Sequence, residues 1–130
     1  MQRPLPTPSP LEQPYFDGCR EGELRLQTCN HCHRAQFYPR VLCSHCGHDD
    51  LSWQPASGLG VVASFTVARR AVSQAFEAPY VIALIDLEEG VRLMSHVVDV
   101  DPDAVTVGLP VTVAFEAWSE DVTMPIFKPR

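Results

Sequence analysis

Two Cys-x-x-Cys pairs constrain the fold of this chain more than any other feature of its 130 residues. The pairs are Cys29 with Cys32 and Cys43 with Cys46, and the ten residues between them suffice for a hairpin that brings the pairs together. Four thiolates gathered in this way favour tetrahedral zinc, and iron also accepts such ligands. Because a closed four-cysteine site leaves no coordination position for a substrate, the sequence predicts a structural metal rather than a catalytic one.

Other interpretations of the cysteine region stay open. A disulfide or a redox pair explains one Cys-x-x-Cys motif but not two facing copies. Gly47 permits a left-handed turn after the second pair, and His33 occupies the equivalent position after the first. The fifth cysteine, Cys19, is interpreted as a small apolar residue of a helix. Nearby histidines can replace a thiolate, although flanking histidines are more often solvated; these are His31, His33, His45 and His48.

The N-terminal half is predicted to contain a proline-rich arm, a helix and the metal-binding ribbon. Residues 1–28 hold the arm and the helix, since prolines crowd the start and residues 11–21 have helix-forming composition before Gly22. Residues 29–56 form the zinc ribbon, and the alternating residues 24–27 lead into it as a strand. The predicted inner face of the helix consists of Leu11, Tyr15, Phe16 and Cys19.

Residues 57–130 show the period-two alternation of β-strands. Asp101 and Pro102 begin a brief helical turn between the third and fourth predicted strands, and residues 88–90 form a hairpin link. This layout is typical of a five-stranded OB-fold barrel, and a small five-stranded sandwich is the alternative. The predicted class is therefore mainly β, with an N-terminal helix before the ribbon and barrel. The predicted strands span residues 61–68, 80–87, 91–98, 110–117 and 122–127.

The charge of the chain argues against a nucleic-acid partner. The formal net charge is −6, and residues 57–130 carry ten acidic and five basic residues. Nucleic-acid binders normally show a basic footprint, because contacts to phosphates supply much of their affinity.

No apolar run approaches the roughly 20 residues that span a bilayer, so no membrane segment is expected. The start also lacks the layout of a signal peptide, which makes the cytoplasm the expected location.

The candidate contact residues are aromatic or cationic, and no catalytic motif accompanies them. The chain lacks a nucleophile elbow, a Walker loop and a dinucleotide-binding glycine pattern. Arg69 and Arg70 follow the first long strand, where they can meet the phosphates of an anionic cofactor or remain solvated. A barrel of this size cannot bury every aromatic side chain, which makes four of them candidate partner contacts: Tyr15, Phe16, Phe37 and Tyr38. Packing of Phe37 and Tyr38 between ribbon and barrel is the alternative.

An ordered series of motifs resembles a known family. It includes Glu21-Gly22-Glu23-Leu24, Phe37-Tyr38-Pro39-Arg40, Ser57-Gly58-Leu59-Gly60, Ser64-Phe65-Thr66-Val67, Pro79-Tyr80 and Pro125-Ile126-Phe127-Lys128-Pro129. The order is similar to that of OB-fold proteins with an N-terminal rubredoxin-like zinc ribbon, long described as a domain of unknown function. The resemblance runs from about residue 11 to the C-terminus and adds Phe65 and Tyr80 to the candidate contacts. One departure is Met94-Ser95-His96, where the family often has Thr-Asn or Gly-Asn.

The resemblance implies a non-catalytic accessory subunit of an acyl-CoA-processing complex. Members of this family pair with thiolase-like enzymes or with hydratases, and some form an aldolase that cleaves the side chain of a steroid-CoA. The resemblance therefore implies a thiolase-like partner, a CoA thioester shared with that partner, and retro-aldol carbon–carbon cleavage. The alternative is a stand-alone module that binds acyl-CoA or single-stranded nucleic acid. The nucleic-acid form of this alternative is open because zinc ribbons and OB-folds can both bind nucleic-acid strands.

Overall fold

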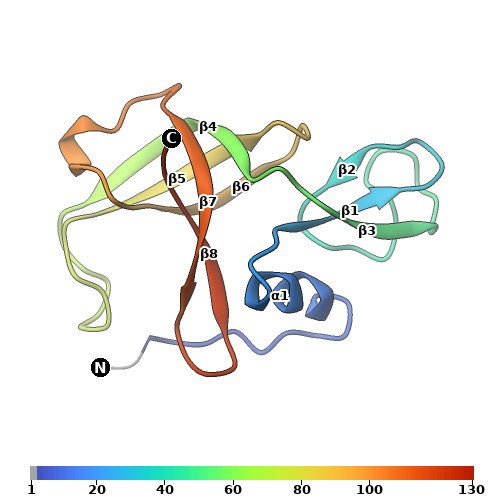
Figure 1. Ribbon diagram of the computed structural model, residues 1–130, viewed down its shortest axis with the longest axis horizontal. Coiled ribbons are helices and arrows are strands. Elements are labelled where there is room, and N and C mark those ends of the chain that lie inside the picture. Colours follow the sequence, from blue (N-terminus) through green and yellow to red (C-terminus); the bar gives the residue numbers. More distant parts are fainter. Residues whose placement is uncertain (1–2) are drawn as a thin grey trace.

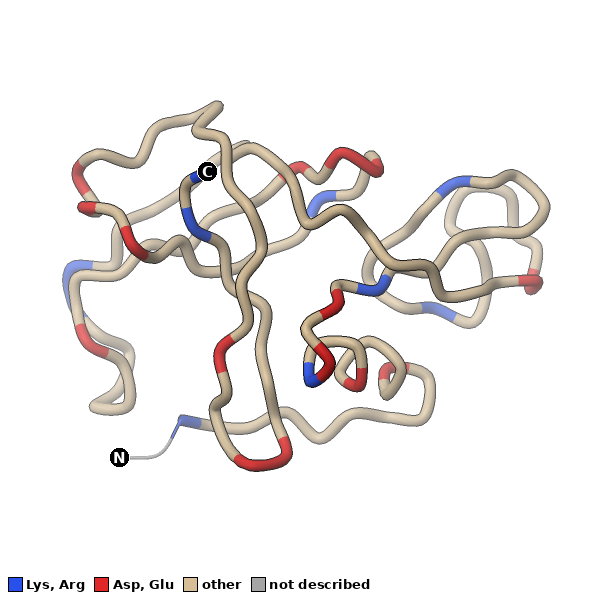
Figure 2. Tube along the Cα trace, in the orientation of Figure 1, with Lys and Arg blue, Asp and Glu red and all other residues tan. Residues whose placement is uncertain are grey.

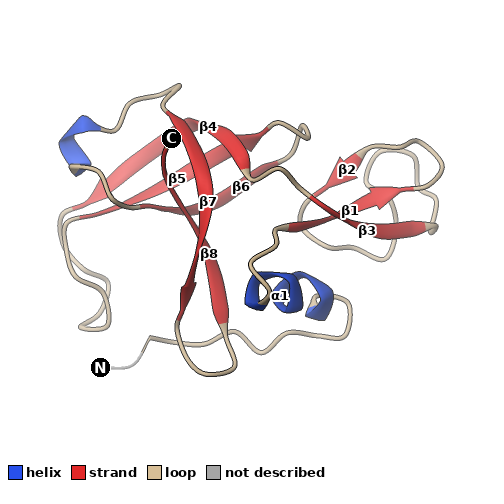
Figure 3. Ribbon diagram, in the orientation of Figure 1, coloured by secondary structure: helices blue, strands red, loops and turns tan. Residues whose placement is uncertain are grey.

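A computed structural model describes residues 3–130, which form a ribbon and a barrel with one helix at their junction (Figure 1). Strands make up most of the regular structure (Figure 3), which confirms the mainly β class with one N-terminal helix. None of the described helices is long and apolar enough to cross a bilayer. The elements are α1 (Gln13–Arg20), β1 (Arg25–Cys29), β2 (Ala35–Gln36), β3 (Leu51–Pro55), β4 (Leu59–Ala68), β5 (Tyr80–Leu87), β6 (Arg92–Val97), the 3-10 helix η1 (Pro102–Ala104), β7 (Pro110–Ala117) and β8 (Thr123–Pro129).

The last five strands close into a barrel in the order β4-β5-β6-β8-β7. A bulge between Val62 and Ser64 lets β4 bend, so that it pairs with both β5 and β7. A parallel contact between Val97 of β6 and Phe127 of β8 completes the ring. Because the five strands close into a ring, the domain is the predicted OB-fold barrel and not the alternative five-stranded sandwich. Two predicted strands have the observed bounds, and the other three differ by at most two residues at either end.

The core of the barrel is apolar, and it continues toward the helix and the ribbon. Ile85, Val111 and Phe127 have no exposed surface. Alternation along the strands places these side chains inside, and the same buried cluster includes Tyr15 and Cys19 of α1. Burial raises the pKa of the Cys19 thiol to about 12, in agreement with the apolar role predicted for this residue.

Helix α1 begins two residues later than predicted, and Leu11 is not part of it. The backbone N–H groups of Glu12 and Gln13 both donate to Ser9 O, which forms a turn and leaves Leu11 exposed. At the other end, Gly22 has a φ of +76° and its N–H donates to Cys19 O, as in a glycine-terminated helix. This tight ending directs the chain immediately into β1.

The ribbon is a three-stranded antiparallel sheet in the order β2-β1-β3. Its first strand is tied to the helix, because the Arg25 guanidinium pairs with Glu21 at 2.6 Å and with Glu23 at 2.8 Å. Gly18 makes this approach possible, since a Cβ at that position would lie 2.7 Å from Glu23 O. The helix therefore holds the ribbon at a fixed place beside the barrel.

Candidate metal centre and apolar cleft

The four cysteines predicted as metal ligands lie together in two backbone knuckles. Their Sγ atoms all lie within 4.8 Å of one another. The Sγ atoms of Cys29 and Cys46 are 3.6 Å apart, and so are those of Cys32 and Cys43. A tetrahedral site with Zn–S bonds of about 2.3 Å separates its sulfur atoms by about 3.8 Å. The distances therefore fit a four-cysteine zinc site.

The two knuckles share one backbone construction. The N–H of His33 donates to Cys29 O at 2.9 Å, and the N–H of Gly47 donates to Cys43 O at 3.0 Å. Both donors have positive φ values, +63° for His33 and +82° for Gly47. The equivalence predicted for these two positions is therefore confirmed, although only one of them is glycine.

Backbone amides lower the pKa of two of these thiols, those of Cys29 and Cys43. The N–H groups of Cys32 and His31 donate to Cys29 Sγ at 3.4 Å and lower the pKa of Cys29. Burial opposes ionisation of Cys43, but hydrogen bonds from the N–H groups of His45 and Cys46 and from the neighbouring Cys32 and Cys46 thiols together lower the pKa of Cys43 to about 6. At Cys46 a backbone hydrogen bond from His48 acts in the same direction, but burial and the neighbouring thiols raise its pKa to about 12. Because like charges at this separation repel strongly, four thiolates need a cation among them. The donor set thus fits zinc, with no position left for a substrate.

The neighbouring histidines contact the site from its solvent side. His31, His33, His45 and His48 are all exposed, as expected for residues that flank a knuckle. His48 Nδ1 lies 3.3 Å from Cys46 Sγ, and the rings of His31 and His48 stack with centroids 3.6 Å apart. Four sulfur atoms remain the candidate ligand set, with the histidine pair beside the exposed Cys46.

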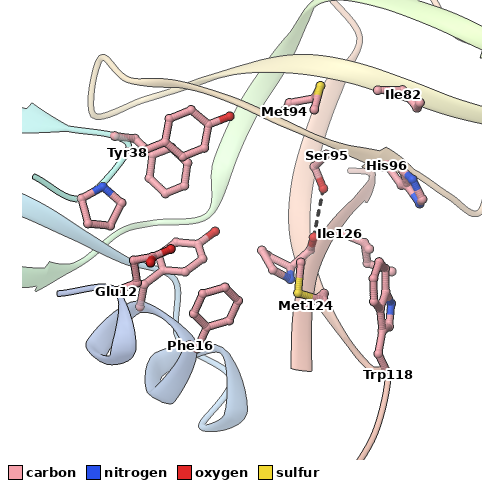
Figure 4. Close-up of a pocket in the computed structure, with 14 residues that line it drawn as sticks. Glu12, Phe16, Tyr38, Ile82, Met94, Ser95, His96, Trp118, Met124 and Ile126 are labelled. Carbon is pink, nitrogen blue, oxygen red and sulfur yellow. Dashed lines mark hydrogen bonds between the residues drawn. The ribbon is translucent and has the colours of Figure 1, made fainter. Parts of the chain in front are cut away.

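An apolar cleft opens where helix, ribbon and barrel meet (Figure 4), and its volume is about 350 Å³. Helix α1 and the turn before it supply one wall, and the loop after β2 supplies the second. Strands β5 and β6 and the β7–β8 hairpin supply the barrel side. The lining residues are Glu12, Tyr15, Phe16, Phe37, Tyr38, Pro39, Ile82, Met94, Ser95, His96, Trp118, Met124, Pro125 and Ile126.

Aromatic rings in edge-on and tilted contact form the helix and ribbon walls of the cleft. The Tyr15 ring lies 5.4 Å from Phe16 and 5.2 Å from Phe37, and the Phe37 ring lies 4.3 Å from Tyr38. Tyr15 is 6% exposed, and its burial raises the pKa of its hydroxyl. Tyr38, by contrast, is 55% exposed. The wall is therefore fixed at its base and open at its mouth, with Phe37 packed against the core and Tyr38 free to contact another molecule.

Four of the eight predicted contact residues, Tyr15, Phe16, Phe37 and Tyr38, line this cleft, and the other four lie outside it. Phe65 borders a second depression, over β4, β5 and β6, which shares Ile82 and Met94 with the cleft. Arg69 pairs with Asp103 at 2.5 Å beyond the end of β4, next to the exposed Arg70. The Tyr80 ring lies 5.5 Å from His96. The structure thus places four of the aromatic candidates in the cleft and the other two, Phe65 and Tyr80, outside it.

The barrel side of the cleft includes residues that the sequence analysis did not select. Met94 and His96 lie two positions apart on β6, and strand alternation therefore places them on the same face. The sequence could have predicted from this spacing that the two side chains belong to one surface. Between them, the Ser95 hydroxyl donates to Pro125 O at 3.0 Å. Trp118 and Met124 reach the cleft from the two ends of the β7–β8 turn, and no local pattern predicts that placement.

Comparison with known proteins matches both parts of the chain. The ChsH2 rubredoxin-like zinc ribbon domain matches residues 16–52, and the ChsH2 C-terminal OB-fold domain matches residues 53–116. A probable enoyl-CoA hydratase alpha subunit of Thermomonospora curvata is 35% identical over 127 residues, which are 98% of this chain and 40% of that protein. The 3-oxo-4,17-pregnadiene-20-carboxyl-CoA hydratase alpha subunit of Mycobacterium tuberculosis is 38% identical over 109 residues, which are 81% of this chain and 34% of that protein. This chain thus spans less than half the length of these two relatives.

A solved structure matches over a comparable length. A chain described as the Ltp2-ChsH2(DUF35) aldolase superposes with a TM-score of 0.89 at 34% identity, covering 96% of this chain and 98% of that one. The zinc ribbon and OB-fold implied by the sequence resemblance are therefore confirmed. From its domain matches and this full-length likeness, the chain belongs to the ChsH2 (DUF35) family of zinc-ribbon and OB-fold proteins.

Proposed function

We propose that this chain is a non-catalytic accessory subunit of an acyl-CoA-processing complex, with a thiolase-like enzyme as its partner. The observation that carries the proposal is the likeness to the ChsH2(DUF35) aldolase chain over nearly the whole of both chains. Such complete likeness supports a shared mode of assembly beyond a shared domain type. The proposed reaction of the complex is retro-aldol carbon–carbon cleavage of a CoA thioester, and a steroid acyl group is one candidate substrate, since a relative is named for a pregnadiene-carboxyl-CoA.

In this proposal the partner supplies most of the chemistry, and this chain supplies a wall. Zinc, when bound by the four cysteines, crosslinks the two knuckles and thereby holds the loop that carries Phe37 and Tyr38. The cleft presents mainly apolar side chains, which suit an acyl group or the apolar centre of an interface. Tyr38 and Met94, 55% and 61% exposed, are the proposed anchors at its mouth.

The remaining predicted contacts have subordinate roles in the proposal. Arg69 and Arg70 are the candidate contacts for CoA phosphates, although Asp103 already neutralises part of the Arg69 charge. Phe65 extends the apolar surface from the cleft along β4, while Tyr80 supports His96 behind the cleft wall. A nucleic-acid role is disfavoured, because acidic residues occupy several loops of the barrel (Figure 2).

A second candidate is an enoyl-CoA hydratase complex. The Thermomonospora relative bears that description, and its likeness covers 98% of this chain. In such a complex, water adds across a carbon–carbon double bond and no carbon–carbon bond breaks. The two candidates therefore differ in the reaction that a reconstituted complex performs.

Co-expression with the thiolase-like proteins of the native host tests the proposal. We expect the tagged chain to retain one of them, and we expect the complex to cleave a β-hydroxyacyl-CoA of a steroid while either protein alone does not. Hydration of a steroid enoyl-CoA without cleavage would favour the second candidate. Full turnover by this chain alone, or failure to retain any thiolase-like protein, would overturn the proposal.

Matched variants locate the interface in the same experiment. Tyr38→Ala and Met94→Ala each remove an exposed anchor at the mouth of the cleft, and we expect partner affinity to fall about tenfold or more. Val72→Ala is the control, because Val72 is 79% exposed and lies outside the cleft. Equal affinity in all three variants would place the interface elsewhere on the chain.

A further inference from the structure

The side chain of Arg3 occupies a cage on the barrel that is far from it in sequence. Its guanidinium carbon lies 4.8 Å from the centroid of the Phe76 ring and 5.0 Å from that of Trp118. Arg3 Nη1 donates to Glu116 Oε1 at 2.6 Å, and Nε donates to Ala75 O at 3.2 Å. The guanidinium thus has two aromatic neighbours, a carboxylate and a carbonyl, which together match its planar, charged form.

The cage is connected directly to the barrel side of the cleft. Trp118 Nε1 donates at 2.9 Å to the same Glu116 oxygen that accepts from Arg3. The Phe76 ring meets Trp118 and His96 edge to face, with centroids 6.2 Å and 6.0 Å away. Trp118 and His96 line the cleft on the side opposite Phe16 and Tyr38 (Figure 4). Arg3 therefore contacts the back of the wall that faces the cleft.

The segments that carry this wall have little regular structure to hold them. Phe76 lies in the connection between β4 and β5, residues 69–79, and Trp118 begins the turn between β7 and β8. Loops of this kind move more readily than the strands they join. Arg3 contacts both loops at once, so a single side chain can restrict the loop that carries Trp118 and the loop that supports it from behind.

The arm is suited to deliver this side chain. Prolines at positions 4, 6, 8 and 10 fix φ at every second residue and leave the arm fewer conformations to lose. An extended proline-rich segment advances about 3.1 Å per residue, so the arm covers roughly 19 Å between Arg3 and Ser9, where the turn before α1 begins. In Figure 1 the arm crosses the lower part of the β7–β8 hairpin on its way to α1.

We propose that Arg3 is a positioning residue for the cleft, which sets the placement of Trp118 and His96 by filling the cage formed by Phe76, Glu116 and Trp118. The arm is then a strap that shapes the barrel side of the cleft from behind. This inference rests on the geometry of the cleft alone, and it holds for whichever partner or acyl group the cleft receives.

Tryptophan fluorescence tests the strap in the full chain. Trp53→Phe removes the other tryptophan, so that the remaining emission reports Trp118. In this background, Arg3→Ala is expected to raise the acrylamide quenching constant of Trp118 severalfold, while Arg3→Lys keeps part of the protection, because an ammonium group also stacks on aromatic rings. Arg20→Ala is the control, since Arg20 is exposed on α1 and lies outside the cage.

A second measurement separates positioning from general destabilisation. His96 is faced by Arg3 of the arm, Tyr80 of β5 and Glu116 of β7. Loss of the Arg3 charge should raise the pKa of His96, observed by proton NMR, with the thermal midpoint within a few degrees of the parent. Unchanged quenching and an unchanged His96 titration in Arg3→Ala would overturn the proposal. If Arg3→Ala unfolds, Arg3→Lys carries the test: a Trp118 quenching constant above that of the parent would support the cage, and one equal to that of the parent would overturn the proposal.

Discussion

The ribbon and the barrel are stabilised by different interactions. The barrel encloses an apolar core in which Ile85, Val111 and Phe127 are fully buried. At the centre of the ribbon lie two glutamines, Gln27 and Gln36, which are 4% and 3% exposed. Burial of apolar surface drives the folding of the barrel, while the ribbon depends on a metal and on satisfied polar groups.

In the ribbon, hydrogen bonds of the buried pair Gln27 and Gln36 take the place that apolar packing has in the barrel. Gln36 Nε2 donates to Gln27 Oε1 at 2.8 Å, and that oxygen also accepts from the N–H of Arg40 at 2.8 Å. Gln27 Nε2 donates to Arg40 O, and Gln36 Oε1 accepts from the N–H of Ser44. These bonds fix the loop between the cysteine pairs, which is also the loop that carries Phe37 and Tyr38 to the cleft. The region held by polar contacts and a metal site therefore carries the ribbon side of the proposed contact surface.

Removal of zinc should have the largest effect on stability, and it should affect the ribbon without affecting the barrel. Binding of structural zinc is worth on the order of 10 kcal/mol at neutral pH, so Cys43→Ser or chelation should unfold the ribbon and leave the barrel folded. Amide NMR spectra would show loss of dispersed ribbon signals with retained β4–β8 signals. Cys19→Ala is the matched control and should keep its full zinc content. Unfolding of both regions together would show that the barrel depends on the metal.

The converse change is Phe127→Ala in the barrel. Truncation of a fully buried phenylalanine costs about 3–5 kcal/mol, through lost burial and the cavity left behind. Urea unfolding should report this loss, while zinc content per folded molecule stays the same. Val72→Ala, at a side chain that is 79% exposed, should change the free energy of unfolding little. Zinc loss from folded Phe127→Ala would mean that the two regions share one cooperative unit.

Gln27→Leu should weaken the ribbon by a smaller amount. The substitution removes the acceptor of the Arg40 N–H and leaves Gln36 Nε2 with Leu42 O alone, and an unsatisfied buried polar group costs about 1–3 kcal/mol. We expect faster zinc release to a chromophoric chelator and faster hydrogen exchange in residues 36–44, with barrel exchange unchanged. Gln54→Leu is the control, because Gln54 is exposed on β3. Equal release rates in the two variants would contradict the role given to the glutamine pair.

The smallest expected effect is an acid sensitivity of the barrel. Burial lowers the pKa of His96 below its usual value of 6.5. The positive charge of Arg3 lowers it further, and the negative charge of Glu116 acts in the opposite direction. The unfolded chain then binds a proton more readily, so this contribution to stability is fully present above about pH 6.5 and is lost as the pH falls through the lowered pKa. His96→Gln should flatten the pH dependence of barrel unfolding in this range. His45→Gln, at an exposed histidine, should leave it unchanged.

Sequence reasoning predicted the local features well and the long-range ones less well. The knuckles and strands follow from the cysteine spacing and from period-two alternation, which act within a few residues. Closure of the barrel depends on Val97 meeting Phe127, and the sandwich alternative stayed open because no local pattern encodes that contact. Helix-forming composition places Leu11 in the predicted helix, but the turn at Ser9 competes with helix initiation through backbone hydrogen bonds and delays the start of α1 to Gln13.

The candidate site was predicted in part for the same reason. Tyr15, Phe16, Phe37 and Tyr38 stand out as aromatic residues in segments too short to bury them all. Trp118 and Met124 reach the cleft only because the β7–β8 hairpin folds toward α1, which is a property of the tertiary structure. Gln27 sits in an alternating segment that gives no sign of its burial.

The central claim is that the zinc ribbon positions a contact surface for a partner and takes no part in the chemistry. Native mass spectrometry of the chain with the proposed thiolase-like partner, before and after zinc is removed, tests it most directly. We predict a zinc-containing heteromeric complex that dissociates when the metal is chelated, while the freed chain keeps a folded barrel. A zinc-free chain that still binds the partner with full affinity would contradict the claim.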